Sequence, residues 1–321
     1  MDATEIPLGE LDERAFIDEQ VSAIADAVGD GRAVNALSGG VDSAVVTMLA
    51  HKALGDKLTT YFIDNGLMRA DEPQWTVDLF AKLGVPVELI DAKEQFFASL
   101  KGVTDPEEKR QAITDTFYKN VFARLVRESG ATHLLQGTNF TDVEETVAGI
   151  KRQHNILAQL GIDTESEYGY VVMEPIIQLR KTAVRRVGKA LGLPEELYNR
   201  PPFPGPALSA RVVGEATPDR IETVRKATRI VEQELSETGA FQYLAILHAD
   251  RVTGIRDGKR DYGLQIEVRC WESEDAVTAE PTELTWRTLK QFSGRITAEV
   301  PGVVSVTYNI TTKPPSTIEA I

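Results

Sequence analysis

A junction of six residues at positions 38–43, Ser-Gly-Gly-Val-Asp-Ser, constrains the fold of this chain more than any other feature. The apolar run before it, residues 33–37, predicts a strand, and the pattern that begins near Val41 predicts a helix. Two adjacent glycines let successive amides point into one concavity at the positive end of that helix, an arrangement that binds phosphate. The spacing matches neither the Walker loop nor the Gly-x-Gly-x-x-Gly dinucleotide loop. The sequence therefore predicts a phosphate site of another type, and a plain strand-to-helix turn is the alternative.

Helical and strand patterns alternate around this junction. The patterns predict an opening helix over residues 16–28, a helix to about residue 54, a strand over 58–63, a helix over 72–83, a strand over 87–90, a long helix over 106–128 and a strand over 132–136. This alternation is typical of an α/β fold with a doubly wound parallel sheet, whose ligands bind beyond the carboxyl ends of the strands. Asp64 and Gly137 follow two of these strands, so we expect both to face the phosphate loop.

The pattern changes after about Phe203. A proline-rich turn is followed by predicted helices over 218–235 and 283–300 and predicted strands near 243–248, 264–271 and 303–310. This order indicates a smaller, separate α+β domain. We therefore expect residues 1–202 to form the first domain and residues 203–321 the second.

The composition restricts the partners. The chain has 321 residues, 42% hydrophobic and 26% charged, which is enough for a buried core and about two domains. Its 35 basic and 49 acidic residues give a net charge of −14, which argues against nucleic-acid binding through a broad basic face. The acidic start and the lack of a long apolar run predict no secretory signal and no membrane span, so we expect a cytoplasmic protein.

Six segments, taken in order along the chain, resemble signatures of the GMP synthetase ATP-pyrophosphatase subunit family. The Pro-Phe-Pro-Gly-Pro and Lys-Pro-Pro-Ser-Thr-Ile-Glu segments are distinctive of this family, whereas the phosphate loop is shared with other ATP-pyrophosphatases. The six segments lie at residues 38–43, 64–69, 102–110, 136–138, 202–206 and 313–319. Together they extend over nearly the whole chain.

The resemblance implies a two-step reaction on xanthosine monophosphate (XMP). The purine 2-oxygen attacks the α-phosphorus of ATP and pyrophosphate leaves, after which ammonia displaces AMP to give GMP. Such a reaction depends on positioning and charge neutralisation more than on a side-chain nucleophile. The resemblance also implies ATP and Mg²⁺ as cofactors, a homodimer formed through the second domain, and a separate glutamine amidotransferase subunit.

The resemblance also assigns roles to individual residues. ATP would be bound by the phosphate loop and two further strand ends: Ser38, Gly39, Gly40, Val41, Asp42, Ser43, Asp64 and Gly137. Asp42 would also hold the metal. A lid at about residues 138–172 would supply Asp142, Glu145, Lys151, His154 and Asn155, of which Lys151 and Glu145 join Asp42 as catalytic residues. The purine nucleotide would be bound by Arg211, Lys313, Thr317, Ile318 and Glu319.

The departures from the family pattern are concentrated in and after the lid. The lid segment lacks the proline of the family's Thr-Ile-Tyr-Pro-Asp, and Gln153 replaces a histidine. Residues 176–182 stand where the family has Leu-Arg-x-Leu-(Phe/Tyr)-Lys-Asp. Two alternatives therefore stay open. One is a paralogue that adenylates a related purine and inserts sulfur or another nucleophile, and the other is a non-catalytic nucleotide-binding regulator.

Cys270 is the one cysteine of the chain, so an internal disulfide and a multi-cysteine zinc site are excluded. A glutaminase needs a nucleophilic cysteine with a histidine, and a sulfur carrier needs reactive cysteines. Cys270 instead follows an apolar strand pattern, which favours a packed and inert thiol. We therefore expect ammonia, or sulfide in the alternative reaction, to come from outside this chain.

Overall fold

The structure is a computed structural model that describes residues 4–147, 170–200, 203–274 and 277–320. The chain divides into two compact units. The first unit comprises residues 1–64, 72–91 and 117–200, and the second comprises residues 65–71, 92–116 and 201–321. Two short segments from the first part of the sequence thus belong to the second unit.

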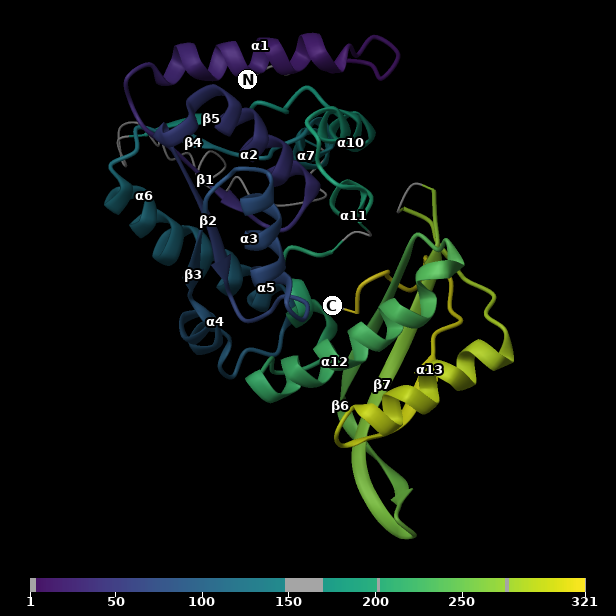
Figure 1. Cartoon of the computed structure of the whole chain (residues 1–321). Coiled ribbons are helices and arrows are strands. Elements are labelled where there is room, and N and C mark those ends of the chain that lie inside the picture. Colours follow the sequence, from purple (N-terminus) through teal and green to yellow (C-terminus); the bar gives the residue numbers. More distant parts are fainter. Residues whose placement is uncertain (1–3, 148–169, 201–202, 275–276, 321) are drawn as a thin grey trace. The chain divides into compact units, whose positions relative to one another are not determined.

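A five-stranded parallel sheet forms the centre of the first unit, which confirms the predicted fold class (Figure 1). The strands lie in the order β3-β2-β1-β4-β5. Their bounds are Ala33–Leu37 (β1), Leu58–Asp64 (β2), Val87–Asp91 (β3), His133–Leu135 (β4) and Val171–Met173 (β5). The chain runs outward from β1 to β3 and then returns to place β4 on the other side of β1, so the strand order reverses between β1 and β4. A doubly wound sheet binds its ligands at such a reversal.

Helices cover this sheet. The buried helix α2, Val41–Leu54, packs against β1 and β2 and also against α1, Glu13–Val28, and α10, Lys181–Ala190. Helix α3, Glu72–Lys82, packs against β2 and β3 (Figure 1). Among the described residues, the other α-helices of this unit are α6, Ala123–Ser129, α7, Phe140–Val147, and α11, Glu195–Tyr198.

The predicted helix over residues 106–128 is not a continuous α-helix. Helix α5, Pro106–Asp115, is followed by a π-helical stretch, Thr116–Phe122, which leads into α6. The Asp105 side chain caps α5 by accepting hydrogen bonds from the amides of Glu107 and Glu108. The hydrophobic periodicity indicated a helix, but it did not indicate the wider turn.

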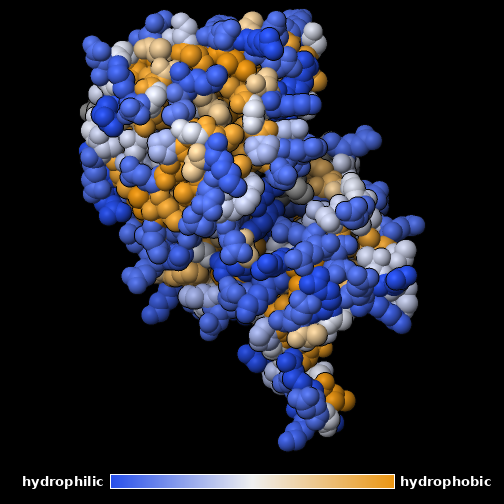
Figure 2. Space-filling view, in the orientation of Figure 1, coloured by the Kyte–Doolittle hydropathy of each residue, from blue (hydrophilic) through white to orange (hydrophobic). Residues whose placement is uncertain are grey.

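A long hairpin dominates the second unit. Strand β6, Gln242–Arg256, pairs antiparallel with β7, Lys259–Glu272. On the other side of β7 lie the short β8, Glu280–Pro281, and the parallel β9, Val303–Tyr308. Both hairpin strands are longer than predicted, because the Asp257-Gly258 turn joins them without a break. The far end of the hairpin is mostly hydrophilic (Figure 2).

The two faces of the second sheet differ. Ile266, Val268 and Cys270 alternate along β7 on one face and are buried. Helix α12, Pro218–Leu235, packs on this sheet, and helix α13, Trp286–Glu299, packs against α12 and β9. The opposite face carries a hydrophobic cluster that includes Leu244 and Trp271. The unit also contains α4, Lys93–Leu100, and the 3-10 helix Ala207–Arg211. Within the described residues, no helix has the length and apolar character to cross a membrane.

Candidate functional site

The predicted phosphate loop lies between β1 and α2, at the reversal of strand order. Its two serines close the loop: Ser43 Oγ accepts a hydrogen bond from the amide of Ser38 at 3.1 Å and donates one to Gly40 O at 3.0 Å. Gly40 is the N-cap of α2 and provides no side-chain cap for the first turn. The first amides of α2 are therefore available to an anion, which is the property that the sequence predicted.

At two positions of this site, neighbouring atoms lie so close to the backbone that a side chain would collide with them, so glycine is required. Gly39 has φ +79°, and a Cβ added to it would lie 2.7 Å from Glu72 Oε1. A Cβ on Gly137, in the segment after β4, would lie 3.1 Å from the amide nitrogen of Ser43. The segment after β4 therefore lies against the start of α2, as expected for Gly137.

Opposite charges meet at the start of α2. The Lys181 ammonium, at the first residue of α10, forms an ion pair with Asp42 Oδ2. Asp42 Oδ1 is buried and has no hydrogen-bond partner among the described residues. An unpartnered carboxylate oxygen beside the predicted phosphate loop fits a hard divalent cation such as Mg²⁺. Lys181 was not among the residues predicted for the site, although the lysine of the family's (Phe/Tyr)-Lys-Asp signature stands at this position.

The other predicted residues of the first unit are only partly described. Asp64 is buried at the end of β2, at the same edge of the sheet as the phosphate loop. At the start of α7, Asp142 Oδ2 accepts a hydrogen bond from the amide of Asn139 at 3.1 Å, and Asn139 Oδ1 accepts one from the amide of Asp142. Glu145 lies in α7. Lys151, His154 and Asn155 lie outside the described residues, and so does most of the predicted lid.

In the second unit the predicted nucleotide-binding residues come together. Arg211 is only 1% exposed, and its Nε and Nη2 donate to the carboxylate of Glu319 at 3.2 and 3.1 Å. Gln242 also donates to Glu319 Oε1, at 2.7 Å. Arg211 Nη1 is buried and has no hydrogen-bond partner among the described residues. A guanidinium with an unused buried donor suits a phosphate or carboxylate ligand.

The C-terminal tail lies on the face of the sheet that α12 does not cover. Ile318 packs into the cluster of Leu244 and Trp271. Arg269 Nη1 donates to Thr317 O at 2.6 Å. The backbone of Lys313 exchanges two hydrogen bonds with Ala279. Apolar packing and backbone hydrogen bonds thus both fix this segment.

Glu267 holds Arg269 in place beneath the tail. Its carboxylate accepts hydrogen bonds from His248 at 2.8 Å, Arg269 at 2.5 Å and Asn309 at 3.0 Å. Burial opposes its ionisation, but these donors prevail and lower the pKa of Glu267 to about 2. The carboxylate therefore stays charged at neutral pH and fixes the guanidinium of Arg269.

Phe203 is a residue of this cluster that the sequence analysis did not select. Its ring contacts two guanidiniums, with the Cζ atoms of Arg69 and Arg211 at 3.9 and 4.9 Å from the ring centroid. Arg69 is held in turn by Glu232, at 2.5 Å between Nε and Oε1. The Pro-Phe-Pro-Gly-Pro segment thus supplies an aromatic surface that positions Arg211.

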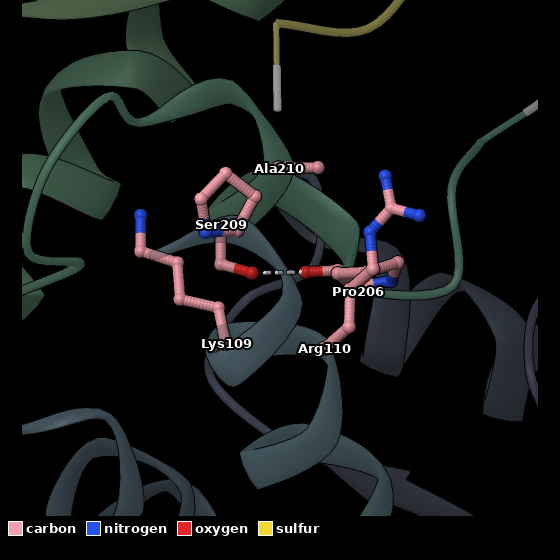
Figure 3. Close-up of a pocket in the computed structure, with 6 residues that line it drawn as sticks. Lys109, Arg110, Pro206, Ser209 and Ala210 are labelled. Carbon is pink, nitrogen blue, oxygen red and sulfur yellow. Dashed lines mark hydrogen bonds between the residues drawn. The ribbon is translucent and has the colours of Figure 1, made fainter. Parts of the chain in front are cut away.

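A small pocket in the second unit shows how two of the quoted segments meet (Figure 3). Its lining comes from α5 and from the turn after Phe203: Pro106, Lys109, Arg110, Pro206, Ser209 and Ala210. Figure 3 shows the side chains of Lys109 and Arg110 pointing in different directions, and Ser209 Oγ donating to Pro206 O at 2.6 Å. Lys109 Nζ donates to Val212 O at 2.7 Å, which ties α5 to this turn.

Two family models match this chain. Residues 14–211 match the family described as NAD synthase, and residues 229–320 match the family described as GMP synthase C terminal domain. The first match includes the phosphate loop, and the second includes the tail.

Several named relatives align with nearly the whole chain. A subunit of the glutamine-hydrolyzing GMP synthase of Archaeoglobus fulgidus is 46% identical over 309 residues, which are 96% of this chain and 99% of the relative. The subunit of the same name from Methanothermobacter thermautotrophicus is 45% identical over 95% of this chain and 97% of the relative. That of Methanopyrus kandleri is 41% identical over 96% and 99%.

Proposed function

The chain belongs to the family of this GMP synthase subunit, and from that premise we propose how its residues carry out the reaction. It is an ATP-dependent ligase that forms GMP by amination and acts with a separate glutamine amidotransferase subunit. We take XMP as the nucleotide that is aminated. In the first step an O–P bond forms between the purine 2-oxygen and the α-phosphorus of ATP, and the bond to pyrophosphate breaks. In the second step ammonia bonds to the purine carbon and AMP leaves with the oxygen.

The arrangement at the start of α2 is the main support for this proposal. Its uncapped amides and the ion pair of Asp42 with Lys181 lie at the carboxyl end of β1. The amides would bind the leaving pyrophosphate, and Lys181 would neutralise part of its negative charge. Phosphoryl-type transfer needs this positioning and charge neutralisation, and it needs no covalent nucleophile of the protein.

We propose that Asp42 also provides a carboxylate ligand for Mg²⁺. Its Oδ1 is buried without a hydrogen-bond partner among the described residues, and it lies beside the amides that would hold the phosphates. When bound there, Mg²⁺ neutralises charge on the phosphate oxygens. The adjacent Lys181 would keep Asp42 oriented in the absence of the metal.

The proposed nucleotide site lies in the second unit. Arg211 would bind an anionic group of XMP through its unused Nη1, while Glu319 and Phe203 fix its guanidinium. Lys313, Thr317 and Ile318 belong to the docked tail. The lid residues Glu145, Lys151, His154 and Asn155 stay proposals from the family resemblance, and so does a homodimer. The names of the relatives favour amination over the sulfur-inserting and regulatory alternatives.

An assay with the purified chain tests the function. We expect pyrophosphate release from ATP and Mg²⁺ only when XMP is present, and GMP only when ammonium is added. The variant Asp42→Asn should lose most of this activity. Asp56→Asn, near the other end of α2, is the matched control and should keep it. Pyrophosphate release that is independent of XMP, or that responds to another purine nucleotide, would contradict the proposal.

A further inference from the structure

A second cation lies beside the phosphate loop, at a residue that the sequence analysis did not select. Arg200 Nη1 donates to Glu72 Oε1 at 2.6 Å. The same Glu72 oxygen lies 2.7 Å from the point that a Cβ of Gly39 would occupy, and Arg200 Nη1 lies 3.8 Å from that point. The guanidinium is therefore adjacent to the second residue of the loop.

Helix α3 fixes this arginine. Glu72 is its first residue and Trp75 follows one turn later, so both side chains lie on one face of the helix. Arg200 Cζ lies 5.6 Å from the centroid of the Trp75 ring, within the range of a cation–π contact. A carboxylate and an indole thus hold one guanidinium in a defined orientation.

The burial of this pair calls for an explanation. The side chain of Glu72 is 2% exposed and that of Arg200 is 21% exposed. Removing two such charges from water offsets most of their attraction, so a buried ion pair contributes little net stability compared with apolar packing. A guanidinium has five N–H donors and can therefore bind more than one anionic group at once.

We propose that Arg200 contacts the pyrophosphate portion of ATP in the phosphate loop and that Glu72 positions it for this contact. Arg200 contacts Glu72 through Nη1, and its guanidinium would bind the phosphate oxygens beside Gly39. The loop then has a cation on each flank, Lys181 beside Asp42 and Arg200 beside Gly39. This inference rests on the proposed function, because it requires that the loop bind pyrophosphate.

The test is calorimetric binding of inorganic pyrophosphate, with magnesium chloride present, to the full chain without XMP. Arg200→Met should weaken binding tenfold or more, as expected for the loss of a charge-assisted hydrogen bond. Arg200→Lys keeps the charge but loses the planar fork, so its binding should be intermediate. Arg186→Met, which removes an arginine paired with Glu13 between α10 and α1, is the matched control and should bind like the wild type.

The double variant Glu72→Gln/Arg200→Met distinguishes a direct contact of Arg200 with the ligand from a role in which Arg200 only neutralises Glu72. If Arg200 only neutralises Glu72, removing both charges restores pyrophosphate binding, and the inference is overturned. If Arg200 contacts the ligand, the double variant stays as weak as Arg200→Met. Wild-type affinity in Arg200→Met would equally overturn it. If the wild type itself fails to bind pyrophosphate, the proposed phosphate site fails first and the inference fails with it. Thermal unfolding of each variant identifies losses that come from misfolding.

Discussion

At the scale of single residues, Gly39 combines two constraints at the centre of the proposed phosphate site. Its φ of +79° is unfavourable for other residues, and a Cβ would collide with Glu72. Gly39→Ala should therefore abolish pyrophosphate release and lower the free energy of unfolding by about 1–3 kcal/mol. Gly55→Ala is the matched control, because Gly55 follows α2 with φ +53° but has open space around its Cβ position. It should be destabilised by about 1 kcal/mol and keep its activity. Assays of pyrophosphate release and urea unfolding distinguish the two, and an active Gly39→Ala would contradict the loop assignment.

Lys109 gives a prediction for the pH dependence of stability. Burial, with a contribution from the charge of Arg220, lowers the pKa of Lys109 to about 8. An unfolded lysine titrates near about 10.4, so between these values the unfolded chain binds more protons than the folded chain. The contribution of Lys109 to the free energy of unfolding should therefore increase as the pH rises from about 8 to about 10.4. The variant Lys109→Met lacks this group. Urea unfolding of both proteins should therefore show that the free energy of unfolding of the wild type increases relative to that of the variant over this pH range. A constant difference would contradict the lowered pKa.

The residue scale also shows what the sequence could predict about the site. The serines, the glycines and Asp42 lie within six consecutive positions, so their roles follow from local backbone chemistry. Lys181 and Arg200 reach the loop from distant points of the chain, and their partners are set by the fold. A lone lysine or arginine is most often a solvated surface residue, so only the family signature at residues 176–182 could have pointed to Lys181.

At the scale of elements, the sequence predicted what hydrophobic periodicity and turn residues determine. The strand over 58–63 and the helix over 218–235 are present with nearly the predicted bounds. The π-helical stretch after α5 was missed, because its apolar residues recur much as they do in an α-helix. The hairpin was predicted too short, because the outer parts of β6 and β7 are largely exposed and lack a regular alternation of apolar residues.

The C-terminal tail is the element whose docking can be tested most directly. Ile318 is 9% exposed and packs on the sheet, whereas Ile310, in the same terminal segment, is 78% exposed. Ile318→Ala should loosen the tail and with it the contact of Glu319 with Arg211, so we expect the KM for XMP to rise about tenfold while pyrophosphate binding is unchanged. Ile310→Ala is the matched control and should leave both properties unchanged. An unchanged KM in Ile318→Ala would remove the tail from the proposed nucleotide site.

At the scale of the whole molecule, the two units carry complementary chemistry. In the proposed function, the amides and cations of the first unit would bind a polyphosphate, and the buried Arg211 and the tail of the second would bind a nucleotide. The fold class of each unit could be predicted because its hydrophobic residues recur at helix or strand spacing along the sequence. The membership of residues 65–71 and 92–116 in the second unit was not, because segments that are distant in sequence can be placed together only by tertiary contacts.

The whole chain should also depend on an external source of ammonia. Cys270 is 1% exposed on the helix-covered face of β7, and burial raises the pKa of its thiol, so it is unsuited to attack glutamine. The purified chain should form GMP with ammonium and none with glutamine, and addition of the amidotransferase subunit should restore the use of glutamine. Cys270→Ala should keep the ammonium-dependent rate and lose about 1 kcal/mol of stability, because it removes only a small buried group. GMP formation from glutamine by the chain alone, abolished by Cys270→Ala, would show instead that this thiol is a nucleophile.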